Sequence, residues 1–429
     1  MKIIITQESN FAEEIDRLVN RFSLAAEGVE EKVKAIIHRV HQEGDRALLD
    51  YSREFDGVSL AREDLLVKRS EIEAAYGQVR PEEIAAMELS IVRIREFHRH
   101  QKSESWFYAE ENGTVLGQLV TAIEKVGIYV PGGKASYPSS VIMGVVPAQI
   151  AGVKDIVIAS PPGKAKTLSP YTLVAADLLG VQKICKVGGA QAVAALAYGT
   201  ESVPRVQKIV GPGNIFVTLA KRQVFGLVDI DMLAGPSEVL VLCDHTASAE
   251  YTAADLLSQA EHDERAFTMV VTPEGSIIQE VQRQVATQVE QLPRKEIASR
   301  SLQDYGYLIQ TKDMEEAIGL VNELAAEHLI LAVENPFALL PRIQNAGSIF
   351  LGHFTPETMG DYLAGPNHVL PTSGTARFFS SLGVDTFCKR SGFTHCTRSG
   401  LKQMGPSAVT LAEIEGLTAH AMAVRRRLP

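Results

Sequence analysis

Gln259 and His262 lie three residues apart in the segment SQAEHDERA, and both side-chain types can bind a metal ion. Side chains at positions i and i+3 of a helix are neighbours on its surface, so the two could converge on one cation. Glutamine is an uncommon zinc ligand, and the apolar stripe of the same helix faces the other way. The spacing therefore leaves two interpretations open, a solvated helix face and half of a metal site.

A second reactive pair, Glu327 and His328, lies in NELAAEHLILAV, where a helical pattern passes into a strand-like run. An acid beside an imidazole can act as a general acid and base when burial tunes both toward neutral pH. A histidine on an apolar face is equally typical of a core residue whose ring makes one satisfied hydrogen bond. Both roles remain open for this pair.

Four more candidates occur towards the C-terminus. Asp361 and His368 belong to GDYLAGPNHVLPTSG, where turn formation alone explains the glycine, proline and asparagine residues. Glu415 and His420 are five positions apart in EIEGLTAHAMAV. Residues at that spacing point in different directions on a helix, so an ordinary amphipathic arm also accounts for this second pair.

The elements that would position these residues follow an α/β pattern. Four short apolar runs, each followed by Gly or Pro, alternate with alanine-rich helical stretches: KVGIYVPGG, KDIVIASPPG, KICKVGGAQ and KIVGPGN. This alternation is typical of βαβ units and a parallel sheet, in which ligands bind beyond the carboxyl ends of the strands. None of the turns matches G-x-G-x-x-G, but VGGAQ and GPGN bring backbone N–H groups to helix starts, where phosphates bind.

Further strands are predicted at EVLVLCD, FTMVVTP, YLIQ, LILAV and GSIFL. Residues 12–104 are predicted to be mostly helical, and strands are expected to stop after about Phe379. The tail from Gly400 to Pro429 is expected to form a helix-rich arm. The whole pattern predicts an α/β protein with two sheet-based units and helical arms at both ends.

Composition narrows the class of protein. Of 429 residues, 45% are hydrophobic and 22% are charged, the balance of a soluble globular chain. The net charge is −10, and the only basic block is Arg425–Arg427, which argues against a nucleic-acid or anionic-membrane surface. No apolar run approaches the roughly 20 residues of a membrane span, and no secretory signal is visible. Four cysteines without a C-x-x-C pair favour a reducing, cytoplasmic location.

Taken in order, eight segments resemble the histidinol dehydrogenase family. They are GIYVPGGKASYPSSV, VGGAQAVAALAYGT, KIVGPGN, DMLAGPSEVLV, LLSQAEHD, NELAAEHL, GDYLAGPNHVLPT and EGLTAHA. The resemblance covers essentially the whole chain, from REFDGV near residue 55 to the C-terminal arm. Eight long segments in one order are far more specific than any single segment.

The resemblance implies an NAD-dependent enzyme that oxidises L-histidinol to L-histidine through L-histidinaldehyde, the last step of histidine biosynthesis. It implies that one zinc ion per subunit is held by four ligands: Gln259, His262, Asp361 and, from the other subunit of a homodimer, His420. Zinc would then orient the imidazole and amine of the substrate, because both groups are good ligands when neutral.

Other roles follow from the same resemblance. Glu327 and His328 match the catalytic pair, with His328 taking the alcohol proton and Glu327 activating the water that hydrates the aldehyde. The implied substrate contacts are Ser237, Gln259, His262, His328, Asp361, Glu415 and His420. The implied NAD contacts are Tyr129, Gln191 and Asn214. A covalent route through a thiol is disfavoured, because only Cys185 adjoins one of the matching segments.

The implied fold has two incomplete dinucleotide-fold (Rossmann-like) parallel-sheet units, with terminal arms that are exchanged in the homodimer. An N-terminal arm would comprise residues 1–25, and a C-terminal arm residues 382–429. The first α/β domain, with the metal and catalytic residues, would comprise residues 26–128 and 239–381. The second, with the NAD contacts, would comprise residues 129–238.

Three alternatives use the same residues. A zinc-dependent hydrolase on this α/β scaffold would use the metal to activate water. A dehydrogenase of a related amino alcohol would differ only in its substrate contacts. A metal- or nucleotide-binding regulatory protein would lack turnover. Binding of NAD separates the dehydrogenases from the hydrolase, and turnover separates them from the regulatory protein.

Overall fold

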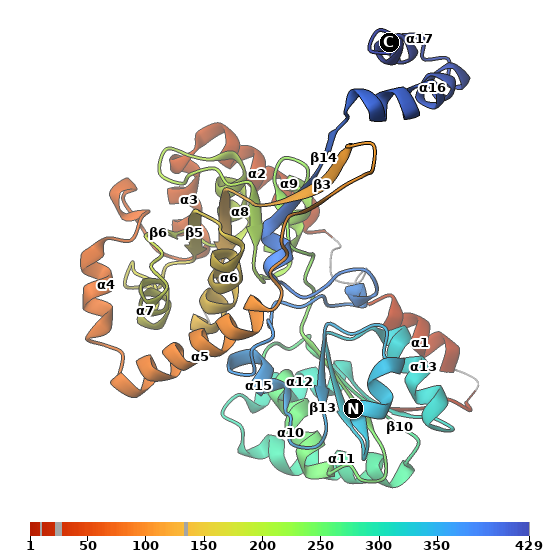
Figure 1. Cartoon of the computed structure of the whole chain (residues 1–429). Helices are drawn as coiled ribbons and strands as arrows, with labels where there is room; N and C mark the ends of the chain where they lie inside the picture. The colour runs from red at the N-terminus through yellow and green to blue at the C-terminus, as the bar shows by residue number, and fades with distance from the viewer. Residues whose placement is uncertain (9–10, 22–27, 133–135, 429) are drawn as a thin grey trace.

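The structure is a computed structural model that describes residues 1–8, 11–21, 28–132 and 136–428. It has two lobes, each built on a parallel sheet, and a helical arm that extends away from both at the C-terminus (Figure 1). Both α/β character and parallel sheets were predicted and are confirmed. Among the described residues, no helix is both long and apolar enough to cross a membrane.

The larger sheet has six strands, and all its pairings are parallel. Its order is β1 (Lys2–Ile5), β11 (Gly306–Gln310), β10 (Phe267–Thr272), β9 (Glu238–Cys243), β12 (His328–Ala332) and β13 (Ser348–Leu351). The central strands β9, β10 and β12 read as almost continuous apolar runs because both of their faces are buried. All five strands predicted after residue 237 are present.

Helices cover the two faces of this sheet. One apolar cluster joins it to α10 (Ala249–Ala260), α11 (Gly275–Gln288) and α12 (Lys295–Tyr305). The cluster on the opposite face includes α1 (Phe11–Val19) and α13 (Met314–Leu324). The first strand and the first helix of the chain therefore belong to a lobe that is otherwise formed by residues beyond 237.

The smaller sheet has five parallel strands, and the first four of them along the chain end in the predicted glycine and proline turns. Its order is β6 (Lys183–Lys186), β5 (Asp155–Ser160), β4 (Lys125–Tyr129), β7 (Lys208–Val210) and β8 (Asp229–Ile230). One face packs on α6 (Pro138–Ala151) and α7 (Pro170–Leu178), and the other on α8 (Gly189–Tyr198) and α9 (Ile215–Val224).

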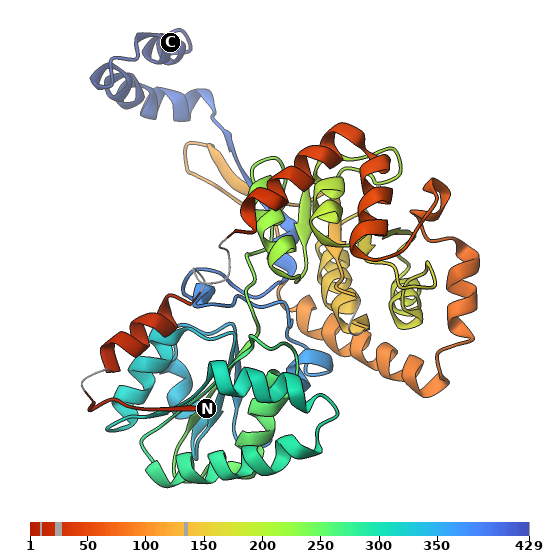
Figure 2. The same ribbon diagram turned by 180° about the vertical axis from the view of Figure 1, so that it is seen from behind.

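The N-terminal helices form an outer layer on the smaller sheet. Helices α4 (Arg69–Tyr76) and α5 (Pro81–Arg99) join the cluster of α6 and α7, whereas α2 (Glu30–Glu43) and α3 (Asp45–Phe55) join that of α8 and α9 (Figure 2). The sequence grouped residues 26–128 with residues 239–381, but these helices bury their apolar faces on the smaller sheet. The predicted boundary between residues 25 and 26 lies outside the described residues.

A third, antiparallel sheet carries the C-terminal arm. It is formed by β14 (Cys388–His395), β3 (Val115–Ala122) and β2 (Trp106–Ala109). The expectation that strands stop after Phe379 was wrong: most residues of β14 are exposed, so it shows no apolar alternation that would mark it as a strand. The predicted helical tail is confirmed as α16 (Arg398–Ile414) and α17 (Thr418–Arg425).

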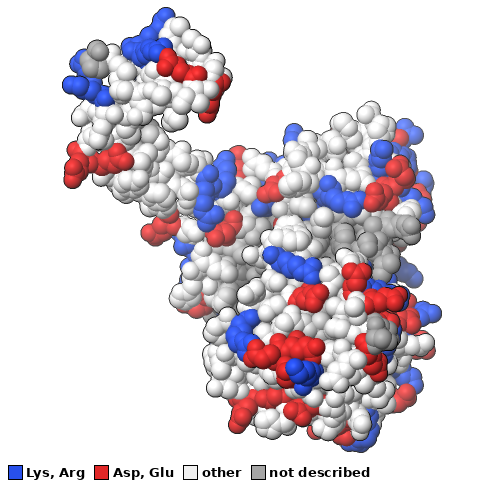
Figure 3. Space-filling view, turned by 90° about the vertical axis from the view of Figure 1, so that its right-hand side faces the viewer, with Lys and Arg blue, Asp and Glu red and all other residues white. Residues whose placement is uncertain are grey.

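The surface carries charges of both signs. On the face drawn in Figure 3, Lys and Arg side chains are interspersed with Asp and Glu, and no broad basic area is visible. The arm projects from the body in the same view and exposes several apolar side chains, among them Leu411, Ile414 and Met422. One chain by itself therefore leaves an apolar surface on its arm uncovered.

Candidate active site

A cleft of about 240 Å³ is lined by residues of both lobes. The smaller-sheet lobe contributes Tyr137, Ser139, Ser140 and the turn Gly211–Asn214. The other lobe contributes most of the side chains that the sequence singled out, namely Ser237, Gln259, His262, Glu327, His328, Asp361 and His368. Segments that are more than two hundred residues apart in the sequence, such as those of Tyr137 and His368, thus meet at one place.

Opposite edges of the two sheets meet at this cleft. The turn Gly211–Asn214 follows β7, so it lies at a carboxyl end, as predicted. In the larger sheet, however, His328 is the first residue of β12, and Glu238 is the first residue of β9. The expectation of a site beyond carboxyl ends is therefore wrong for this sheet, because its catalytic candidates lie at amino ends.

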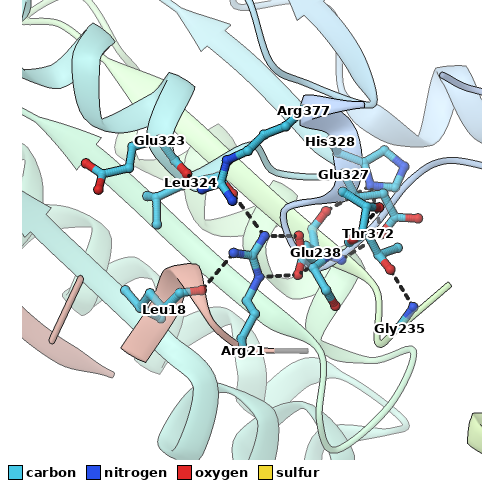
Figure 4. A network of polar contacts seen from close by, with 12 residues as sticks. Leu18, Arg21, Gly235, Glu238, Glu323, Leu324, Glu327, His328, Thr372 and Arg377 are labelled. Carbon is cyan, nitrogen blue, oxygen red and sulfur yellow. Dashed lines mark hydrogen bonds and ion pairs between the residues drawn. The ribbon is translucent and has the colours of Figure 1, made fainter. Parts of the chain in front are cut away.

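The backbone of Glu238 holds the Glu327–His328 pair. Its N–H donates to Glu327 Oε2 at 2.8 Å, and its carbonyl oxygen accepts a hydrogen bond from His328 Nδ1 at 2.9 Å (Figure 4). Since a carbonyl can only accept, the proton of the neutral imidazole lies on Nδ1. The lone pair of His328 is then on Nε2, the ring nitrogen that can accept a proton.

The side chain of Glu238 is anchored in turn by a buried ion pair. Arg21, which follows α1, contacts both carboxylate oxygens, with Nη2 2.7 Å from Oε2. The same guanidinium donates to the carbonyl oxygens of Leu18 and Leu324 at 2.7 and 3.0 Å. The backbone N–H of Ser373 donates to Glu238 Oε1 at 3.0 Å. The acid is thereby fixed from three separate segments (Figure 4).

Sequence reasoning missed both members of this ion pair. Glu238 precedes the apolar run VLVLC, and a charged residue at the buried start of a strand was the available signal. Arg21 carries no local signal, because its role depends on a partner 217 positions away. Both side chains are almost fully buried, with exposed fractions of 1% and 0%.

His328 lies among carboxylates. Its Nε2 is buried, has no hydrogen-bond partner in the described part of the chain, and lies 3.7 Å from Asp361 Oδ1. Burial lowers the pKa of His328, but the carboxylates of Glu327 and Asp361 outweigh burial and hold the pKa above its ordinary value. Burial raises the pKa of Glu327. The alternative of a core histidine whose hydrogen-bonding groups are all paired therefore does not fit His328, because its Nε2 has no partner among the described residues.

Gln259 is buried in the last turn of α10, so a solvated helix face does not describe it. Its amide lies between Glu357 Oε1 and the backbone N–H of Glu238, at 3.0 and 3.3 Å. Glu357, which the sequence predictions missed, also accepts a hydrogen bond from Ser258 Oγ at 2.7 Å, and burial raises its pKa to about 8. Asp361 on α15 (Glu357–Tyr362) and His262, just after α10, line the same cleft.

Glu415 and His420 do not reach this cleft within the chain. Both are exposed, one at the end of α16 and the other on α17. Of the four predicted metal ligands, the cleft thus brings together three: the amide of Gln259, the imidazole of His262 and the carboxylate of Asp361. Within the described residues, no group of three or more His, Cys, Asp or Glu side chains could hold a metal ion.

The predicted NAD contacts line a second pocket of about 330 Å³. The hydroxyl of Tyr129 accepts a hydrogen bond from the N–H of Gly189 at 3.1 Å, and Gln191 lies in the first turn of α8. Asn214 caps α9, and it lines both this pocket and the cleft. Asn214 is therefore a wall residue of both cavities.

Comparison with known proteins identifies the family. The family model described as histidinol dehydrogenase matches residues 19–428. The chain belongs to the histidinol dehydrogenase family. The predicted resemblance and the predicted class of enzyme are both confirmed.

Individual members of this family are similar over the full length. The histidinol dehydrogenase of Syntrophotalea carbinolica is 52% identical over 100% of this chain and 99% of its own length. That of Geobacter sulfurreducens is 52% identical, with 100% of each chain covered. A crystal structure of histidinol dehydrogenase from Elizabethkingia anophelis superposes with a TM-score of 0.94 at 40% identity, covering 100% of this chain and 98% of the other.

We expect Arg21→Met to lower the free energy of unfolding by about 3–5 kcal/mol, because it leaves the carboxylate of Glu238 buried without its partner. Urea denaturation followed by circular dichroism measures this loss. Arg283→Met is the matched control, since it breaks an exposed ion pair with Glu280 and should change stability little. Equal effects of the two substitutions would show that the buried pair does not hold this lobe together.

Proposed function

We propose that this chain catalyses the NAD-linked, four-electron oxidation of L-histidinol to L-histidine through L-histidinaldehyde, with one zinc ion per subunit, as the last step of histidine biosynthesis. The observation that carries the proposal is the cleft itself. Candidate metal ligands and an acid–imidazole pair line it together, and it shares the wall residue Asn214 with a second pocket. Membership of the histidinol dehydrogenase family supports the choice of substrate.

The residues of the cleft fit a zinc ion. Gln259, His262 and Asp361 offer oxygen and nitrogen donors of the kinds that zinc binds, and one chain leaves room for a fourth ligand. His328 Nε2 and Glu357 Oε2 are buried and have no partner among the described atoms, which supports a further positively charged ligand beside them. When bound, zinc would supply that charge and an anchor for the imidazole and amine of histidinol.

His328 is positioned to act as the general base. In its neutral form, with Nδ1–H committed to the carbonyl of Glu238, His328 can accept the hydroxyl proton of histidinol on Nε2 as a hydride leaves the carbinol carbon for NAD. Glu327, buried beside it and held by the N–H of Glu238, would take a proton from the water that hydrates the aldehyde. His328 would then act again in the second oxidation. Both half-reactions together convert histidinol, two NAD and water into histidine, two NADH and three protons.

Substrate contacts and NAD contacts are assigned to the two cavities. Ser237 lines the cleft, where its hydroxyl would contact histidinol beside the metal ligands. Tyr129, Gln191 and Asn214 would contact NAD in the second pocket, near the amino ends of α8 and α9. Because Asn214 borders both cavities, a nicotinamide in the second pocket could extend towards the reacting carbon.

We also propose a homodimer in which the arms are exchanged. The arm carries Glu415 and His420 away from its own cleft and exposes Leu411, Ile414 and Met422. An apolar hollow of about 450 Å³ adjoins the cleft and shares His262 with it. The arm of a second copy would cover apolar surface there, and the partner subunit's His420 would complete the zinc ligands. Two incomplete dinucleotide-fold units, one per lobe, would then form each body of the dimer.

The location proposed for this enzyme is the cytoplasm. The four cysteines are free, and burial raises the pKa of Cys185 and Cys243 to about 12.

Within the described lining of the cleft there is no cysteine, which supports a route without a covalent thiohemiacetal.

The decisive assay follows the absorbance of NADH with histidinol as substrate. We expect two NADH per histidinol consumed, loss of activity on chelation, and recovery on addition of zinc. One NADH per substrate would instead point to an ordinary alcohol dehydrogenase. NAD-independent release of a hydrolysis product would favour the zinc hydrolase.

Substitution of the acid–imidazole pair should separate the half-reactions. We expect Glu327→Gln to slow aldehyde oxidation by about 10²–10⁴-fold, so that more aldehyde is captured by a carbonyl-trapping reagent than with His328→Asn. His328→Asn should slow both half-reactions, because the imidazole serves in each. Equal slowing of both steps by both variants would contradict this division of roles.

Exchange of the arms can be tested by complementation. A His420→Ala chain and a His262→Ala chain should each be nearly inactive alone, since each lacks one zinc ligand in every site. Mixed dimers should recover activity, because one of their two sites then has all its ligands. Heterodimers verified by two different affinity tags that remain inactive would indicate sites built within one chain.

A further inference from the structure

The pocket that we assign to NAD contains one carboxylate with no role so far. Asp56 directly follows α3 and lines this pocket together with Tyr129, Gln191 and Asn214. Its backbone is fixed, because its N–H donates to the carbonyl of Ser52 at 3.1 Å. The Cα atom from which this side chain extends therefore has a defined position in the pocket wall.

Asp56 is half-buried, and one of its two carboxylate oxygens lacks a hydrogen-bond donor. Its Oδ2 is buried and has no partner among the atoms of the described residues. Burial raises the pKa of Asp56 to about 6, and no other influence on this group is resolved. A buried carboxylate oxygen without a donor is costly, so the described part of the fold gives no compensation for the burial of Oδ2.

Its place at the end of α3 adds to that cost. The carboxyl end of a helix carries partial negative charge and favours cations, so an aspartate there is unfavourable. Among the described residues, neither side-chain helix capping nor an ion pair accounts for the carboxylate of Asp56. A ligand that brings hydroxyl donors into the pocket would satisfy it.

The remaining lining of the pocket suits a nucleoside. Ile36, Phe55 and Phe216 offer apolar surface for a base, and Phe55 is 52% exposed, stacked on Tyr51 with ring centroids 5.2 Å apart. None of the described lining residues is a lysine or arginine that could pair with a phosphate on the ribose. In dinucleotide sites generally, an acid accepts from the ribose hydroxyls, whereas arginine accommodates a 2′-phosphate.

We propose that Asp56 accepts hydrogen bonds from the adenosine ribose hydroxyls of NAD and excludes dinucleotides that carry a 2′-phosphate. This inference rests on the proposed function, because it places NAD in that pocket. Asp56 is thus a residue that determines cofactor specificity. The acid comes from an outer helix, α3, rather than from the end of a sheet strand.

The test compares Asp56→Asn with the unmodified protein, using NAD and NADP as alternative acceptors for histidinol oxidation. We expect the ratio of kcat/KM for NADP to that for NAD to rise by about tenfold or more, because a like-charge repulsion and a charged acceptor are both removed. The change should appear in KM for the dinucleotide, with kcat at saturating NAD close to that of the parent. Glu54→Gln, on the exposed side of the same helix, is the matched control and should leave the ratio unchanged.

An unchanged ratio in folded Asp56→Asn, with NAD-dependent activity intact in the parent, would overturn the role of Asp56 and leave the proposed function standing. Failure of the parent to oxidise histidinol with either dinucleotide would overturn the proposed function instead. Calorimetric titration of the parent with ADP-ribose and with 2′-phospho-ADP-ribose gives a result that needs neither turnover nor a variant. Preferential binding of ADP-ribose supports the proposal, and equal affinities contradict it.

Discussion

The buried contact between Arg21 and Glu238 governs the geometry of the active site. Glu238 occupies the start of the central strand β9, and its two backbone polar groups hold the acid and the imidazole of the pair that we propose to be catalytic, Glu327 and His328. Its side chain cannot move without breaking a bidentate ion pair and a hydrogen bond from Ser373. A buried pair of this kind need not add net stability, but loss of one partner is strongly unfavourable. The pair therefore specifies position more than it adds stability.

The arrangement of two opposed sheet edges explains how one cleft serves two kinds of chemistry. The carboxyl ends of the smaller sheet provide glycine turns and helix starts, which suit a phosphate-containing cofactor. The amino ends of the larger sheet provide charged side chains at the first positions of strands, where the backbone still has free groups to orient them. Helix α10 runs back from the far edge and delivers Gln259 and His262 to the same place. The smaller-sheet lobe thus supplies backbone groups for a cofactor, and the larger-sheet lobe supplies the ionisable side chains.

Much of this was accessible from the sequence, because it depends on local patterns. Apolar runs such as EVLVLC predicted the strands, and turns such as VGGAQ predicted where a phosphate-containing cofactor could bind. The segments around Gln259, Glu327 and Asp361 predicted the residues that line the cleft. What escaped prediction depends on distant contacts. Arg21 and Glu357 acquire their roles from partners in other segments, and the exposed strand β14 has no apolar alternation. Helices α2–α5 gave no sign of which sheet they would cover, since an amphipathic face is compatible with either.

The early part of the chain has consequences for how the protein folds. In the described part of the chain, strand β1 pairs with β11 alone, and the guanidinium of Arg21 contacts a carbonyl 303 positions further on. Loop closure over such distances is slow, so the larger sheet cannot acquire its outer strand until most of the polypeptide has been synthesised. The smaller lobe, whose helices and strands are contiguous in sequence, can form first on the ribosome. Competence for catalysis is then acquired late, when the segment that contains β1 and Arg21 docks against residues 306–324.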